Sequence, residues 1–157
     1  MAGRVAQRLR DLKIELPIAH VAEIAKIEGY AMANGWFFVS GQIPKWGGER
    51  KFIGKVGREF NLAEGQAAAR LSGLNVLAQC HKALDGDLDR VIRVMKVNGF
   101  VNALPTFTEI PQVVNGASEL FLEVFGDAGR HARTAVGVAV MPFDVAIEIE
   151  ATFLVRP

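Results

Sequence analysis

The chain has a single cysteine, almost no charge imbalance and no long apolar run, and each shortage limits what the protein can be. Cys80 is the only cysteine among 157 residues, so no intramolecular disulfide can form, and a reducing compartment such as the cytoplasm is expected. Lys and Arg total 18 against 17 Asp and Glu, and the net charge of +1 offers no footprint for nucleic acid or an anionic membrane. No apolar run approaches the ~20 residues that span a bilayer, and the N-terminal stretch lacks the apolar segment of a signal peptide.

Histidine is scarce as well. His20, His81 and His131 are scattered and lack the spacing of a metal site, so we expect none. Cys80 and His81 are adjacent in an expected helix, where neighbours do not face each other, which favours a packed thiol over a nucleophilic pair. His131 differs from the other two because it stands two residues before Arg133 and could border a cleft there.

Half of the residues are apolar, which is enough to bury a core in one domain of this length. We therefore expect a single domain over residues 1–157. An amphipathic helix is expected at its start, over about residues 3–15, with Val5, Leu9 and Leu12 on one face.

Residue patterns predict the rest of the secondary structure. Strands are expected where β-branched and aromatic residues cluster, and helices where apolar residues recur every three or four positions. The expected elements are a strand in GWFFVSGQIP, a turn in KWGGER, a helix over about 61–85, a strand from Val91 and a helix from Pro111 to Gly126. With two strands in the segment 131–151, the order strand, strand, helix, strand, helix, strand, strand predicts an α+β domain with both helices on one face of the sheet.

Several local features support these elements. Asn61 followed by Glu64 resembles a capping box, and Gly99 is expected to mark a bulge or bend in its strand. The apolar positions expected to repeat along the first long helix are Ala67, Leu71, Leu74 and Ala78. Those expected to be buried by the second are Val113, Val114, Ala117, Leu120, Phe121, Val124 and Phe125.

The segment HARTAVGVAVMPFDVAIEIEA, residues 131–151, reads as a hairpin that contains charges. If Met141 to Asp144 form the loop, Val140 pairs with Val145. The face expected under the helices then carries Val136, Val138, Val140, Val145, Ile147 and Ile149. The opposite face carries Arg133, Ala135, Gly137, Ala139, Ala146, Glu148, Glu150 and Thr152, a small and charged surface suited to a ligand or to another subunit.

Two interpretations of these charges stay open on residue patterns alone. Arg133 can hold a carboxylate through a two-point fork, and a nearby glutamate can bind that arginine, orient water or act as a general base or acid. Alternatively, the arginine forms a cross-strand salt bridge with a glutamate, or an intersubunit pair. Sequence spacing does not decide between them.

Three motifs, SGQIP at 40–44, NGASELFLEVFG at 115–126 and ARTAVGVAVMPFDVAIEIEA at 132–151, resemble the Rid family of reactive-intermediate deaminases. This family is also called YjgF-like and is often labelled endoribonuclease L-PSP. The likeness runs from about Ile27 to the C-terminus and is closest to a longer subgroup that has the N-terminal helix. It implies a chorismate-mutase-like α+β fold, with a mixed six-stranded sheet, two helices on one face, and a homotrimer with three ligand clefts between subunits.

The resemblance also implies roles for particular residues. Arg133 stands where the family's arginine binds the substrate carboxylate, and Glu148 where a glutamate positions or activates water. The implied reaction is hydrolysis of an enamine or imine of a 2-amino acid to a 2-oxo acid and ammonia, with no metal or organic cofactor, because imines already react with water. Other matching positions near the cleft are the Ala135 backbone, Ser40, Gly41 and Asn115.

The chain departs from deaminating relatives at two positions, and both concern the substrate. Ile27 stands where they carry a tyrosine, with Tyr30 nearby, and Gly137 replaces a common glutamate. The deaminase hypothesis therefore stands beside two others. One is a trimeric binder of small carboxylates without turnover, and the other is a set of charges that only lock the trimer. Ribonuclease activity is disfavoured, because no basic patch with interleaved aromatics occurs.

Overall fold

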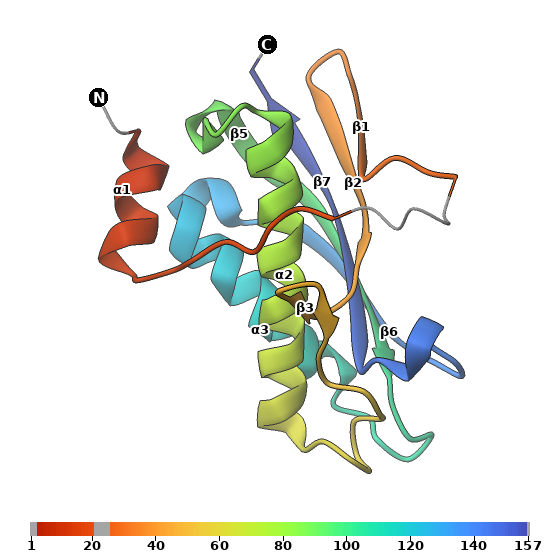
Figure 1. Ribbon diagram of the computed structural model, residues 1–157. Helices are drawn as coiled ribbons and strands as arrows, with labels where there is room; N and C mark the ends of the chain where they lie inside the picture. Colours follow the sequence, from red (N-terminus) through yellow and green to blue (C-terminus); the bar gives the residue numbers. More distant parts are fainter. Residues whose placement is uncertain (1–2, 21–25, 157) are drawn as a thin grey trace.

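The computed structural model describes residues 3–20 and 26–156, and Figure 1 shows its helices and strands. They are α1 (Arg4–Asp11), β1 (Tyr30–Ala33), β2 (Trp36–Gln42), β3 (Lys45–Trp46), β4 (Glu49–Arg50), α2 (Leu62–Ala83), β5 (Val91–Asn102), α3 (Ile110–Phe125), β6 (Ala132–Val138) and β7 (Ile147–Val155). Short 3₁₀ turns lie at Leu88–Arg90, Gly126–Gly129 and Pro142–Asp144.

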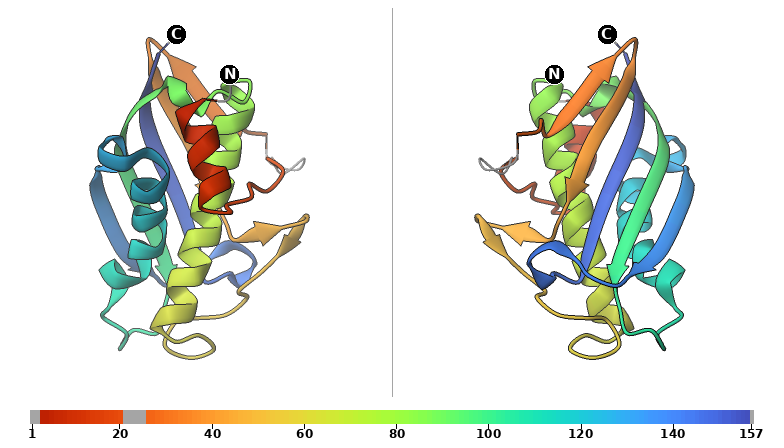
Figure 2. Two further views of the ribbon diagram at one scale, coloured as in Figure 1. Left: turned by 90° about the vertical axis from the view of Figure 1, so that its left-hand side faces the viewer. Right: turned by 90° about the vertical axis from the view of Figure 1, so that its right-hand side faces the viewer.

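The main sheet has five strands in the order β1-β2-β7-β5-β6, in which β6 runs parallel to β5 and the other neighbours are antiparallel. Helices α2 and α3 cover one face, and in the right-hand view of Figure 2 the strands lie in front of both helices. The α+β class is confirmed, but the expected six strands are five. The KWGGER segment, expected as a turn, forms the separate two-stranded hairpin β3–β4 around Gly47 and Gly48.

The expected pairing of the last two strands is wrong, because β5 lies between β6 and β7. Val97 of β5 is the partner of Arg133 on one side and of Ala151 on the other. After β5 the chain crosses over through α3 and returns parallel to it, as a strand-helix-strand unit does. The turn at Pro142–Asp144 then carries the chain past the end of β5 to the other side.

This topology also reverses the expected faces of β6. Paired residues point to the same face, and Val97 is fully buried under the helices, so Arg133 lies on the helix side together with Ala135 and Gly137. Val136 lies on the helix-free face and is 42% exposed. The faces of β7 are as expected, since Ile147 and Ile149 are buried in the core.

The start of α2 is confirmed. The Asn61 side chain accepts a hydrogen bond from the Glu64 backbone N–H at 2.9 Å, and the Glu64 carboxylate accepts one from the Asn61 N–H at 2.8 Å. The expected apolar repeat is displaced, because Ala67 is exposed and both Leu71 and Leu74 are only half-buried. The buried stripe of α2 consists largely of small residues, among them Gly65, Ala69, Ser72 and Gly73.

Small residues let α2 and α3 approach each other closely. A Cβ on Gly116 of α3 would overlap the backbone carbonyl of Gln66, and one on Gly73 would lie 3.0 Å from Leu120. Gly99 has a related role and is not the expected bulge. The register of β5 shifts between Val91 and Arg93 and again between Val94 and Lys96, whereas a Cβ on Gly99 would lie only 2.5 Å from Val114 of α3.

The expectations for the other helices hold in part. All seven apolar positions predicted in α3 are buried, and the helix ends at Gly126, whose φ is +63°. The N-terminal helix is shorter than expected, at Arg4–Asp11. Val5 is buried in the core, Leu9 is half-buried, and Leu12, which follows the last turn, is 44% exposed.

The close contact of α2 with α3 predicts that Gly116→Ala destabilises the protein by ~1–3 kcal/mol, because the added methyl group forces a backbone contact apart. Chemical denaturation by urea measures the loss. Gly137→Ala is the matched control, since the nearest atom to a Cβ there is 3.5 Å away, and its effect should stay within about 0.5 kcal/mol. Equal losses in the two variants would contradict the packing argument.

Candidate functional site

Arg133 contacts α3 through uncharged partners. Its Nη1 donates to Asn115 Oδ1 at 2.8 Å and to Ser118 Oγ at 3.1 Å. Asn115 and Ser118 are three residues apart and so lie on the same side of α3, facing β6. The family resemblance implied that Asn115 lies near the same cleft as Arg133, and the structure places the two side chains in contact, whereas Ser118 was not predicted.

The guanidinium of Arg133 has capacity left for a ligand. Arginine carries five N–H donors, and both hydrogen bonds given above leave from Nη1. Among residues 3–20 and 26–156, no carboxylate lies within 4.0 Å of Arg133, although its side chain is half-buried. A half-buried cation without a counter-ion is costly, and the Nε and Nη2 edge matches the two oxygens of a carboxylate.

His131 continues this cluster. Its Nδ1 lies 2.6 Å from the Gly129 carbonyl oxygen, and its Nε2 lies 2.9 Å from Ser118 Oγ. Because a carbonyl only accepts, Nδ1 carries the hydrogen, and in the neutral ring Nε2 accepts from the Ser118 hydroxyl. Burial lowers the pKa of His131, the Gly129 carbonyl opposes this shift, and the Arg133 cation adds to it, so the neutral ring is favoured.

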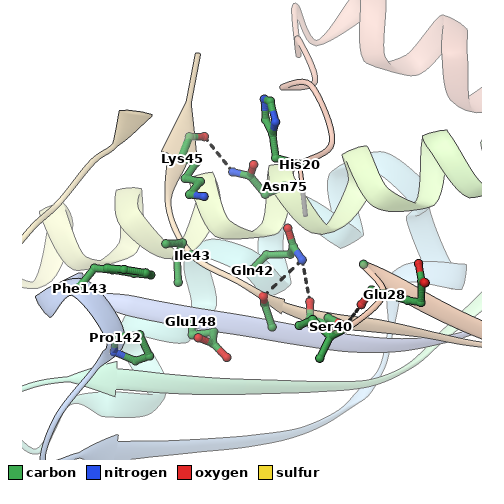
Figure 3. Close-up of a pocket in the computed structure, with 13 residues that line it drawn as sticks. His20, Glu28, Ser40, Gln42, Ile43, Lys45, Asn75, Pro142, Phe143 and Glu148 are labelled. Carbon is green, nitrogen blue, oxygen red and sulfur yellow. Dashed lines mark hydrogen bonds between the residues drawn. The ribbon is translucent and has the colours of Figure 1, made fainter. Parts of the chain in front are cut away.

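A second cluster surrounds Glu148, which lines a cavity of about 330 Å³ together with Ser40 and Gly41 (Figure 3). Ser40 Oγ donates to the Glu28 carbonyl at 2.6 Å and so ties the preceding segment to β2. A Cβ on Gly41 would overlap the Glu148 carboxylate, so a larger residue there would displace that side chain. Ile27, which the resemblance sets against a tyrosine of deaminating relatives, also lines this cavity.

The two glutamates of β7 have different surroundings. Glu150 accepts a hydrogen bond from Asn98 Nδ2 at 2.8 Å, whereas no side chain or backbone N–H in the described part of the chain donates to Glu148. Burial, and after it the charge of Glu150, raises the pKa of Glu148 above its usual range. Of the two glutamates, Glu148 is therefore the one whose protonated form the fold favours.

The structure does not bring the two clusters together within one chain. Glu148 is the partner of Phe100 in β5, three residues beyond the Val97 that pairs with Arg133, so Arg133 and Glu148 point to opposite faces of the sheet. The cross-strand salt bridge considered from the sequence is therefore wrong for the single chain. We call the Arg133, Asn115, Ser118 and His131 group the arginine half-site, and the Glu148, Ser40 and Gly41 group the glutamate half-site.

Ala135 follows Arg133 on the same face of β6 and is half-buried. As β6 is an edge strand, alternate backbone groups along it have no partner strand. Within residues 3–20 and 26–156, no three His, Cys, Asp or Glu side chains are grouped so that they could hold a metal ion. None of the helices in that part is both long and apolar enough to cross a bilayer.

Comparisons with known proteins agree with the fold. Residues 6–151 match a family described as "YjgF/chorismate_mutase-like, putative endoribonuclease". Protein TCP17 of Trypanosoma cruzi is 49% identical over 151 residues, which cover 96% of this chain and 93% of that protein. A crystal structure of a protein of unknown function from Agrobacterium tumefaciens is 41% identical with a TM-score of 0.90, covering 97% of this chain and 92% of that one.

Escherichia coli TdcF, whose crystal structure contains bound serine, is 28% identical with a TM-score of 0.59 and covers 90% of this chain and 94% of its own. The family match spans both half-sites and nearly all of the sheet. The chorismate-mutase-like fold implied by the sequence resemblance is thus supported by sequence and by structure, with five strands in the main sheet where six were expected. The chain belongs to the YjgF/chorismate-mutase-like family.

Proposed function

We propose that the protein is a cytoplasmic hydrolytic deaminase that converts enamine or imine intermediates of 2-amino acids into 2-oxo acids and ammonia. The observation that carries this proposal is the half-buried Arg133, whose Nε and Nη2 edge has no carboxylate partner among the described residues. A carboxylate is the ligand that such an edge fits best. TdcF, a relative with bound serine, supports a small amino-acid-like ligand.

The placement of the half-sites supports an assembly. The arginine half-site lies at the β6 edge of the sheet, and the glutamate half-site lies between β2 and β7 near the other edge. Head-to-tail contacts between such different surfaces close into rings, which fits the homotrimer that the family resemblance implies. Trp36, Phe38 and Val136 are at least 42% exposed on the helix-free sheet face and would provide apolar surface for the interface.

In the proposed cleft, one copy binds the substrate and the next copy acts on it. Arg133 holds the carboxylate with Nε and Nη2, Asn115 fixes the guanidinium, and the Ala135 backbone N–H donates to the second carboxylate oxygen. Ser40, Gly41 and Glu148 of the neighbouring copy then face the imine carbon. In this arrangement each copy contributes its arginine half-site to one cleft and its glutamate half-site to another, and neither half-site has to rearrange.

The chemistry needs only binding and proton transfer. Protonation of an enamine at its β-carbon, or of an imine at its nitrogen, by solvent gives the iminium ion. Ionised Glu148 takes a proton from water as the water oxygen bonds to the iminium carbon, giving a neutral carbinolamine. Glu148 returns its proton to the amine nitrogen, the carbon–nitrogen bond breaks to release ammonia, and the hydroxyl proton passes to solvent as the 2-oxo acid forms.

A second candidate is a trimeric binder that holds small carboxylates without turnover. The observation that favours it is Ile27, which gives the cavity of Glu148 an apolar side chain where deaminating relatives have a hydroxyl. Tyr30 does not replace that hydroxyl, because it packs against Phe37 with ring centroids 5.3 Å apart. Endoribonuclease activity is less favoured, since neither half-site holds a pair of acid–base histidines.

Removal of each charge separates these candidates. Glu148→Gln should lower the rate of ammonia release from freshly generated 2-iminopropanoate or 2-iminobutanoate by about 10²–10⁴-fold, because proton transfer is lost. It should leave pyruvate affinity within about twofold, while Arg133→Ala should weaken that affinity by more than about tenfold. Ammonia release measured against the uncatalysed rate tests this, and a wild-type protein that binds pyruvate without accelerating release would establish the binder.

Mixing the two inactive variants tests whether the cleft lies between copies. If Arg133→Ala and Glu148→Gln chains are unfolded together and refolded in equal amounts, about one cleft in four combines an intact Arg133 with an intact Glu148. Activity should therefore recover to about a quarter of the wild-type value. Each variant refolded alone is the control, and a mixture that remains inactive while forming mixed trimers would exclude the shared cleft.

The pKa of Glu148 provides an independent test of whether Arg133 of one copy meets Glu148 of the next. A carboxyl group whose pKa is raised by folding stabilises the protein below its unfolded pKa, and this contribution is lost as pH rises through the folded pKa. In the Arg133→Ala background, Glu148→Gln should thus raise the melting temperature at pH 7 but not at pH 4. With Arg133 present across the cleft, the gain at pH 7 should be smaller, and equal gains would show that the two residues do not meet.

A further inference from the structure

A chain of hydrogen bonds leads from Arg133 away from its unoccupied edge. Nη1 donates to Ser118 Oγ at 3.1 Å, Ser118 lies 2.9 Å from His131 Nε2, and His131 Nδ1 lies 2.6 Å from the Gly129 carbonyl. The far end is rigid, because Gly129 is buried and a Cβ there would overlap the Phe121 backbone. The imidazole also packs edge-on against the Phe121 ring at a centroid distance of 6.0 Å.

We propose that Ser118 and His131 are positioning residues for the Arg133 carboxylate clamp. The inference rests on the proposed function, and it names two residues that the resemblance does not. An arginine side chain loses much rotamer freedom when it binds a ligand, and a site that fixes it beforehand avoids part of that loss. Ser118 and Asn115 both hold Nη1, so Nε and Nη2 stay available to a ligand.

The hydrogen bonds from Arg133 through Ser118 to His131 can form in both protonation states of His131. Neutral His131 accepts from the Ser118 hydroxyl, whereas the imidazolium would donate to Ser118 Oγ, and in each state Nδ1 donates to Gly129 and the serine oxygen keeps a lone pair for Arg133. Positioning by Ser118 is therefore expected across the titration of the ring.

The charges around His131 couple its protonation to the ligand. His131, directly before β6, lines a cavity of about 260 Å³ together with Arg130 and Arg133. Arg93 of β5 donates a hydrogen bond to the Arg130 carbonyl. From α3, Ser118, Phe121 and Leu122 are the uncharged neighbours of His131. A proton on His131 adds a cation beside Arg133, which a bound carboxylate offsets, so carboxylate binding and protonation favour each other.

The test is calorimetric titration with pyruvate at pH 6–8 in buffers of different ionisation enthalpy. Ser118→Ala should weaken binding by about tenfold, as expected for one hydrogen bond to a charged group, and Ser118→Thr should restore it to within about twofold. Wild-type binding should take up a fraction of a proton and tighten as pH falls. His131→Gln should bind with no such uptake, while His81→Gln, an exposed histidine on α2, should behave as wild type.

The outcomes separate this inference from the proposed function. If Arg133→Ala abolishes pyruvate binding while Ser118→Ala binds as wild type, the function stands and the positioning role is wrong. Proton uptake in His131→Gln equal to that of the wild type would likewise refute the role of His131. If Ser118→Ala does not fold, the proton uptake of His131→Gln is the measurement that decides whether the inference stands. A wild-type protein that binds no pyruvate would overturn both.

Discussion

The position of β5 between β6 and β7 is the constraint on which the rest of the site depends. Because β6 pairs in parallel with β5 and β7 pairs antiparallel with it, Arg133 falls in the row of Val97 and Glu148 in the row of Phe100. Val97 and Phe100 are three residues apart in β5, and side chains an odd number of residues apart in a strand point to opposite faces of the sheet. The chain therefore cannot neutralise its own arginine with that glutamate, and the side chains that hydrogen-bond to Arg133 are uncharged.

The sequence predicted best what local interactions decide. The capping box of Asn61 and Glu64, the stop at Gly126 and the buried stripe of α3 each depend on residues a few positions apart, and all three are confirmed. The β6–β7 hairpin failed because alternation shows only that two strands exist. Two strands with a short connection look the same whether they pair directly or flank a third, and the parallel return through α3 decides between these arrangements.

Other errors come from residues whose role is steric. Gly65 and Gly73 contribute little to an apolar periodicity, yet they lie on the buried side of α2 because α3 approaches its backbone there. The arginine half-site shows the same limit. Asn115 was reached through resemblance, but Ser118 and His131 become visible only when α3 is placed against β6, although the three-residue spacing from Asn115 to Ser118 was a usable signal.

The uncharged hydrogen-bond partners of Arg133 indicate an advantage that the proposed divided site would have. An arginine paired with a glutamate of its own chain would have to give up that ion pair before binding a ligand carboxylate, and the competing attraction would be intramolecular. Asn115 and Ser118 instead restrain the guanidinium with weaker, neutral acceptors that do not occupy its outer edge. Glu148 has a raised pKa, because it is partly buried and lies near the charge of Glu150. In the proposed assembly, a carboxylate-binding cation and a proton-exchanging carboxyl group could thus coexist in one short sequence, because the fold of the single chain keeps Arg133 and Glu148 on opposite faces of the sheet.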